Sequence, residues 1–188
     1  MMALHSLSRK TEALAERLGF PHDHLYGLRF AVNVFLATAI VWFTLRRISD
    51  SDPIWAIASM IASSDPQPEE ARRLFHSRLV NVLVGCAVGF GFLLLGRPSH
   101  WTVPFALAFT VLISTSLVRI KTMWRQAPIT AAIVLAAGIS VNSTLGGVYR
   151  GLHKVAEVIF GAMVGVLVSW LLSKVWLIPQ PEKTKEPL

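Results

Sequence analysis

Charged residues are scarce in this chain. They make up 15% of the sequence, against roughly 25% in an average soluble domain. Hydrophobic residues account for 53%, and the mean hydropathy is +0.54. This composition, combined with long apolar runs, is typical of an integral membrane protein.

Cysteine is almost absent as well. Cys86 is the single cysteine and lies in an apolar run, which excludes a disulfide framework and a cysteine metal site. We interpret it as a small packing residue. The sequence also lacks a His-Glu-x-x-His motif, a Gly-x-Ser-x-Gly context around Ser140, and a nucleotide-binding loop. We therefore expect a protein that is not an enzyme and that holds no cofactor or metal.

Six apolar segments follow one another along the chain. A helix needs about 20 residues to cross a hydrocarbon core of about 30 Å. The first, third, fourth and sixth segments meet that length, whereas the second and fifth do not. Such short segments are allowed where protein or a water-filled cavity covers their ends, so we expect them in the interior. The segments are 28–45, 53–64, 78–96, 101–120, 128–141 and 155–177.

Two glycine-containing stretches resemble each other. They read "SRLVNVLVGCAVGFGFLLLG" and "HKVAEVIFGAMVGVLVSWLL", and the prolines that open the two short segments also correspond. Each half then has three crossings, so the second half is inverted relative to the first, as in many secondary transporters. Chance likeness between apolar helices is the alternative. The alignment pairs Arg78 with Lys154, Asn81 with Glu157, Gly85 with Gly161, Gly89 with Gly165 and Pro53 with Pro128.

The predicted fold is therefore an all-α integral membrane domain over 28–178, with a 3+3 inverted repeat made of 28–96 and 101–178. Residues 1–27 form an amphipathic segment, which either lies on the membrane surface or packs on the end of the bundle. Residues 179–188 form a disordered tail. Thirteen lysines and arginines fall on the side of the N-terminus and five on the other, which favours cytoplasmic termini. The cations flank apolar segments, which argues against nucleic-acid binding.

The polar residues of the repeat suggest a path for anions. Pro53 and Pro128 are expected as the first residues of the short helices, whose positive dipole ends would point inward and favour anions. Arg78 and Lys154 would begin the glycine helices at opposite membrane faces. Snorkelling of these cations to the interface is the alternative.

Four further polar residues share helix faces in the same way. Asn81 and Glu157 lie about one turn deeper than the two cations, and Glu157 could pair with Lys154 or His153, or relay a proton. Arg29 and Asn33, which are four residues apart, share a face of the first helix in the same way. Trp55 could stack on an aromatic ring or simply pack against the bundle.

The glycines have a separate expected role. Gly85 and Gly89, and likewise Gly161 and Gly165, are four residues apart, a spacing that lets helix backbones approach closely in membranes. The sequence does not say which helix packs on which.

The order of "DPIWAIASMIASSDPQP", the basic "RRLFHSR" and "GCAVG" after a long helix resembles the fusaric-acid-resistance-like, aromatic acid exporter superfamily, which is related to plant aluminium-activated malate channels. The likeness covers residues 28–178. It implies an inner-membrane carrier or channel for organic anions, with aromatic carboxylates as typical cargo. Because related proteins build their path from two six-helix modules, it also implies a homodimer. The alternative is an accessory or anchoring subunit of a larger complex.

Overall fold

The computed structural model describes residues 22–48, 52–95, 101–118, 126–141 and 144–176. Within these ranges every regular element is helical and none is a strand, which confirms the all-α prediction. The elements in chain order are α2 (His22–Ile48), α3 (Ile54–Ala62), α4 (Pro68–Leu95), α5 (Thr102–Ile113) with the π-helical turn η1 (Ser114–Val118), α6 (Gln126–Ile139) and α7 (Thr144–Val175).

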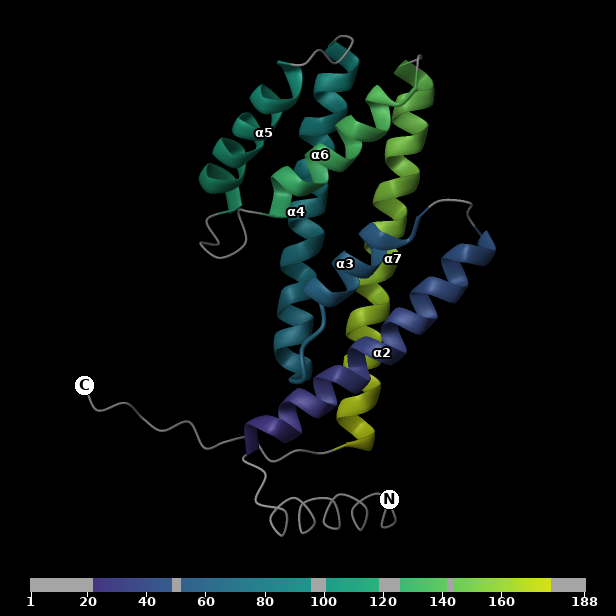
Figure 1. Cartoon of the computed structure of the whole chain (residues 1–188). Helices are drawn as coiled ribbons and strands as arrows, with labels where there is room; N and C mark the ends of the chain where they lie inside the picture. Colours follow the sequence, from purple (N-terminus) through teal and green to yellow (C-terminus); the bar gives the residue numbers. More distant parts are fainter. Residues whose placement is uncertain (1–21, 49–51, 96–100, 119–125, 142–143, 177–188) are drawn as a thin grey trace, which may run out of the picture.

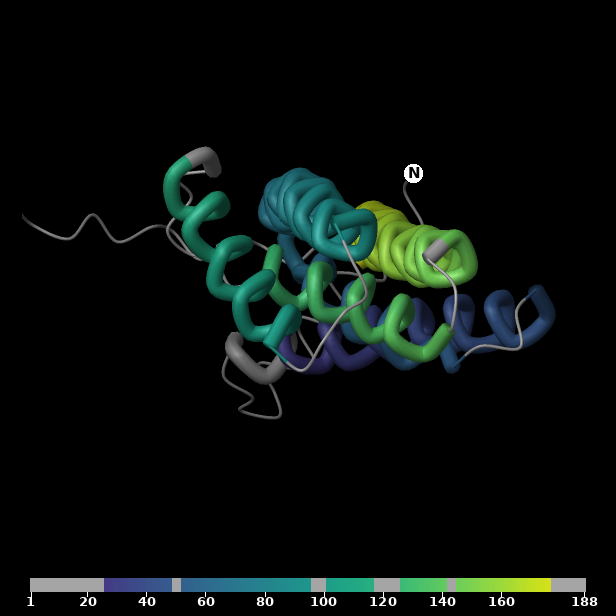
Figure 2. The backbone as a smooth tube through the Cα atoms, turned by 90° about the horizontal axis from the view of Figure 1, so that it is seen from above, coloured from purple at the N-terminus to yellow at the C-terminus, as the bar shows by residue number. Residues whose placement is uncertain are grey.

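Two long helices form the centre of the molecule. α4 and α7 lie side by side and run in opposite directions (Figure 1). Seen from above, α2, α3 and α6 lie on one face of this pair, and α5 lies on the flank formed by α4 and α6 (Figure 2). The two short helices are therefore held against the long pair on the same side.

In the described part of the chain, three helices are long and apolar enough to cross a membrane: Tyr26–Ile48, Pro68–Leu95 and Leu145–Val175. α3 has 9 residues and α6 has 14, which at 1.5 Å per residue gives roughly 14 and 21 Å. The prediction that the second and fifth segments are short is confirmed.

The fourth segment departs from its prediction. It was expected to be one long helix over 101–120, but regular α-helix ends at Ile113 and continues as a π-helical turn, while 119 and 120 lie outside the described residues. The hydroxyl of Thr115 donates to the carbonyls of Val111 and Leu112, and that of Ser116 also donates to Leu112. Hydroxyls that compete for helix carbonyls disturb the regular ladder.

The two glycine helices begin earlier than predicted. α4 starts at Pro68 and α7 at Thr144, so the expectation that Arg78 and Lys154 begin these helices is wrong. A proline in first position and acidic residues in the first turn both favour a helix start, and Glu69 and Glu70 provide the latter. Apolar runs mark the part of a helix that crosses lipid, not its first residue.

Both predicted ends of the chain lie mostly outside the described residues. The expected amphipathic segment is described only from His22 onward, where it is already part of α2. The predicted tail lies beyond the last described residue, Trp176.

The core consists of two apolar clusters that meet along α7. One joins α4, α5, α6 and α7 around residues such as Val82, Val134 and Val158. The other joins α2, α3 and α7 around residues such as Val41 and Met60. Each short helix is thus the centre of one cluster.

The paired glycines allow the short helices to reach the long ones. A Cβ atom on Gly85 would overlap the carbonyl oxygen of Ala127 on α6, and one on Gly161 would overlap the carbonyl oxygen of Ala56 on α3. One turn further on, a Cβ on Gly89 would lie 2.9 Å from Val134 of α6. On α7, a Cβ on Gly165 would lie 2.6 Å from the carbonyl oxygen of Met60 on α3. Gly85 and Gly89 of α4 therefore contact α6, and Gly161 and Gly165 of α7 contact α3.

Gly161→Ala is expected to destabilise the fold, because the new methyl group meets the backbone of α3, which cannot rotate away. Overpacking of this kind costs about 1–3 kcal/mol. The matched control is Gly91→Ala on α4, where a Cβ meets no atom within 4 Å and where alanine favours the helix by about 1 kcal/mol. Thermal unfolding in detergent should show a lower Tm for Gly161→Ala and an unchanged or higher Tm for the control. Equal Tm values for the two variants would contradict the close contact.

Candidate functional site

A buried arginine lies where α4 meets both short helices. Arg78 is 6% exposed. Its Nε–H donates to the hydroxyl of Ser59 on α3 at 3.2 Å, and its Nη1 donates to the side-chain oxygen of Gln126 at 3.4 Å. Because Gln126 is the first residue of α6, the guanidinium lies beside the start of that helix. No described carboxylate forms an ion pair with Arg78.

Further polar groups line the helices around this arginine. Asn81, one turn along α4, donates to the carbonyl of Ser77 at 2.8 Å. The side-chain oxygens of Asn81, Ser77 and Thr130 are buried and have no hydrogen-bond partner among the described residues. Thr130 belongs to α6 and lies against Gly85. A Cβ atom added to Gly85 would lie 2.7 Å from the Cβ of Thr130. Unpaired buried polar atoms are uncommon, and they often mark functional sites.

The equivalent cation on α7 has a different environment. The ammonium of Lys154 lies 2.9 Å from Oε2 of Glu157, whose other oxygen lies 3.5 Å from Nδ1 of His153. Glu157 is 3% exposed and the Lys154 side chain 23%. The ammonium also donates to the carbonyl of Asp52 at 3.4 Å. Since Asp52 lies two residues before the first residue of α3, Lys154 lies beside the start of that helix.

The prolines lie near the starts of the short helices, each at a different position from the one predicted. Pro53 is buried and precedes the first helical residue, Ile54, whose N–H donates to Oδ1 of Asp52 at 3.4 Å. Pro128 is the third residue of α6. The first N–H groups of a helix have no partner within it, so proline is tolerated at several of these positions. The start of each short helix therefore lies beside a cation from the other half of the chain: Lys154 beside α3 and Arg78 beside α6.

Arg29 and Asn33 form a third group, at the opposite end of α3. Asn33 donates to the hydroxyl of Ser169 on α7 at 2.7 Å. Arg29 is 5% exposed, and its Nη2 has no hydrogen-bond partner in the described part of the chain. The structure therefore separates the predicted pathway residues into three groups. Trp55 belongs to none of them: it lies on the outer side of α3 and is 46% exposed.

Sequence reasoning missed several of the neutral partners. Ser59, Gln126 and Ser169 all bind residues that were predicted. One signal was present in the sequence, because Ser59 is an isolated polar residue in the apolar stretch "PIWAIASMIA". Gln126 lies outside the predicted apolar segment, so it could be found only once α6 was placed.

Comparison with known proteins identifies the family. The fusaric acid resistance protein-like family matches residues 34–168, which covers most of the chain and nearly all of the described helices. The chain belongs to this family of membrane transport proteins. No curated protein and no solved structure matches it.

Replacing Glu157 by Gln should destabilise the protein, because Lys154 would keep its charge in a mostly buried position without a carboxylate. Breaking a buried ion pair in this way costs about 3–5 kcal/mol. The matched control is Glu70→Gln, since Glu70 forms an ion pair of the same spacing with Arg73 at the surface, where such pairs contribute about 0–1 kcal/mol. The free energy of unfolding of each variant is measured in detergent at neutral pH. Similar losses for the two variants would show that the Lys154–Glu157 pair is not buried.

Proposed function

We propose that this protein carries organic anions, aromatic carboxylates among them, across the membrane, and that Arg78 binds the carboxylate. The observation that carries this proposal is the buried, positively charged side chain of Arg78, whose hydrogen-bond partners Ser59 and Gln126 are both neutral. The family supplies the general class, a membrane transporter. The cargo and the path are our inference from the site.

The electrostatic argument starts from the cost of burial. A cation at the centre of a membrane helix costs about 2.5–3.5 kcal/mol on insertion scales. At 1.5 Å per residue, Arg78 lies roughly 15 Å from the start of α4 at Pro68. A guanidinium has five N–H donors, and those of Arg78 make two described hydrogen bonds. A carboxylate would compensate the charge and accept two parallel hydrogen bonds.

The surroundings of Arg78 favour an anion further. The positive end of the α6 dipole lies beside the guanidinium and attracts negative charge. The buried hydroxyl of Thr130 lacks a described partner and can donate to an oxygen of the cargo. These donors, together with Arg78, define the binding site that we propose.

Lys154 is assigned a different role. Glu157 compensates its charge, so it holds the start of α3 and does not offer a free charge to the cargo. Arg29 and Asn33 form a second polar position on the same path, at the other end of α3. Trp55, near the start of α3, is the aromatic residue on which we propose the cargo ring stacks, an arrangement that aromatic pairs favour.

Two reciprocal sets of contacts support an inverted 3+3 repeat. Gly85 and Gly89 pack on α6, while Gly161 and Gly165 pack on α3. Arg78 binds the first residue of α6, and Lys154 binds Asp52, two residues before α3. Each half of the chain thus holds the short helix of the other half, as expected for two halves related by a pseudo-twofold axis.

The exposed outer faces of the short helices support a homodimer. Ile54, Trp55 and Ile61 of α3 are exposed, as are Ile129 and Ile139 of α6. Neither helix can cross about 30 Å of hydrocarbon, so their ends must be covered by protein or face a water-filled cavity. We propose that a second copy covers this surface, which places the anion path next to the dimer interface. The proposed location is the inner, or plasma, membrane, with both termini in the cytoplasm.

Arg78→Ala should strongly impair transport. The loss of a charge-assisted hydrogen bond, about 1.5–3 kcal/mol, corresponds to a rise of roughly tenfold or more in KM for a carboxylate. The measurement is uptake of radiolabelled benzoate and malate into liposomes that contain the purified protein. Arg78→Lys should retain part of the activity, since it keeps the charge but loses the bidentate geometry.

Arg73→Ala is the matched control for this experiment, because Arg73 lies on the same helix but is exposed. Its uptake should equal that of the wild type. Equal uptake by Arg78→Ala would refute the binding role of Arg78. A folded wild-type protein that transports neither anion and copurifies with a partner would instead support an accessory subunit.

Cross-linking tests the dimer surface. With Cys86 replaced by Ala, a cysteine at Ile61 should form a cross-linked dimer with a short bis-maleimide, because Ile61 lies on the proposed interface. Leu83→Cys is the control, since Leu83 is exposed on the side of α4 away from the short helices. The opposite pattern, with cross-links at Leu83 alone, would place the interface elsewhere.

A further inference from the structure

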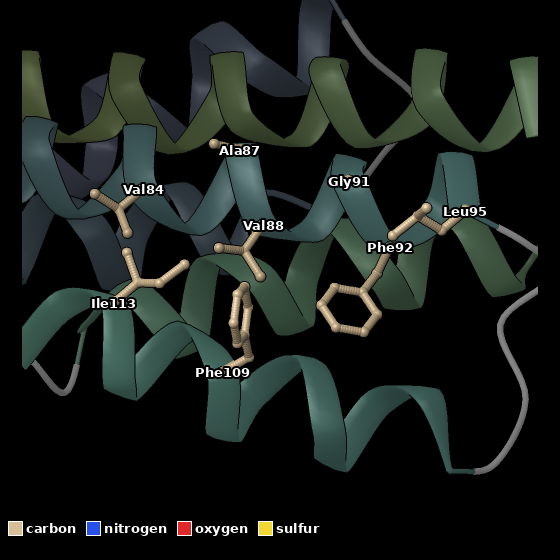
Figure 3. Close-up of a pocket in the computed structure, with 8 residues that line it drawn as sticks. All are labelled: Val84, Ala87, Val88, Gly91, Phe92, Leu95, Phe109 and Ile113. Carbon is tan, nitrogen blue, oxygen red and sulfur yellow. The ribbon is translucent and has the colours of Figure 1, made fainter.

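An apolar groove of about 400 Å³ runs between α4 and α5 (Figure 3). It is lined by residues of α4 between Val84 and Leu95 and by Phe109 and Ile113 of α5. None of the lining side chains carries a nitrogen or oxygen atom. None of the predicted pathway residues lines the groove, and it lies on a different side of α4 from Gly85, which faces α6.

The groove is space that the protein itself leaves unfilled. A Cβ atom on Gly91, one of the lining residues, would meet nothing within 4 Å. The nearest aromatic contact across it joins Phe92 and Phe109, whose ring centres are 6.1 Å apart. An unfilled groove forfeits dispersion contacts along its walls, so an occupant of matching chemistry is favoured.

The position and length of the groove indicate what this occupant is. From Val84 to Leu95 it extends along α4 for roughly 16 Å at 1.5 Å per residue. One leaflet of a hydrocarbon core is about 15 Å thick, half of the full 30 Å. Trp101, at the start of α5, is exposed, as expected for an aromatic residue at the membrane–water interface. The groove therefore begins near this interface and ends near the middle of the bilayer.

We propose that the groove binds one acyl chain of a bilayer phospholipid. The chain lies parallel to α4, with its end near Val84 and Ile113, and its head group lies at the interface near Trp101. A helix from a second copy is about 10 Å across, which is too wide to enter a groove of this volume. The lipid chain thus acts as a packing partner of α5 on the side where α4 leaves space.

Photolabelling tests this proposal. The purified wild-type chain is reconstituted in vesicles that contain a small fraction of phosphatidylcholine with a diazirine in one acyl chain. After illumination, labelled peptides are mapped by mass spectrometry. We expect label concentrated on the lining residues of α4 and α5, well above that on Phe35, which is exposed on α2.

Two variants and a control complete the experiment. Gly91→Leu places a side chain in the groove at a position where its Cβ meets nothing within 4 Å, and Ala87→Leu narrows the groove one turn earlier. Either should lower the label on Phe109 to the level measured on Phe35. Gly27→Leu is the control, because a Cβ atom on Gly27 also meets nothing within 4 Å but Gly27 lies on α2, away from the groove. In this variant the label on Phe109 should equal that of the wild type.

Three results would overturn the proposal. Equal label on Phe109 and Phe35 in the wild type would mean ordinary contact with bulk lipid. Unchanged label on Phe109 in a folded, monodisperse Gly91→Leu or Ala87→Leu protein would mean that the groove holds no chain. A protein–protein cross-link from a photoreactive residue at Phe109 would mean that a second copy fills the groove.

Discussion

The fold depends on the close contact between glycines of the long helices and the backbones of the short ones. A short helix inside a membrane exposes N–H groups at one end and carbonyls at the other, and lipid cannot satisfy either. At Gly85 and Gly161 the backbones approach so closely that no Cβ fits. This contact lets α4 and α7 bury the short helices, and it fixes where their starts lie. It also holds those starts beside the two cations, Arg78 and Lys154.

The two halves of the chain share this arrangement but differ in charge. The alignment that pairs Arg78 with Lys154 also pairs Asn81 with Glu157. The neutral amide Asn81 follows Arg78, and the carboxylate Glu157 follows Lys154. The carboxylate compensates Lys154 within its own helix turn, whereas Asn81 bonds to the backbone of Ser77 and leaves Arg78 uncompensated. One difference in residue type therefore makes the two aligned positions unequal: among the described residues Lys154 has a carboxylate partner and Arg78 has none.

The sequence predicted the features that depend on local pattern. The short lengths of α3 and α6 follow from the lengths of the apolar runs, and the contact between Lys154 and Glu157 was one option raised by their spacing. The starts of α4 and α7 could not be found from hydropathy, because helix geometry continues through residues such as Arg72 and Arg150 that are not apolar. The partners of Arg78 could not be found either. Ser59 and Gln126 come from two helices that are distant in sequence, and only the packing of glycines on short helices brings them together.

The same packing explains why α5 is bound on one side and open on the other. Its buried residues, Ala106 and Thr110, are small, and α5 packs on α6 as well as on α4. In a bilayer, helices do not associate through the hydrophobic effect, because lipid chains are as apolar as the side chains; close packing of small residues takes its place. The large residues of α5, such as Phe105 and Phe109, are exposed, and the surrounding lipid of a bilayer offers them apolar contact equal to that of side chains. α4 therefore separates two environments: Gly85 and Gly89 turn toward the polar site and the short helix α6, while Val84 and Val88 turn toward the groove.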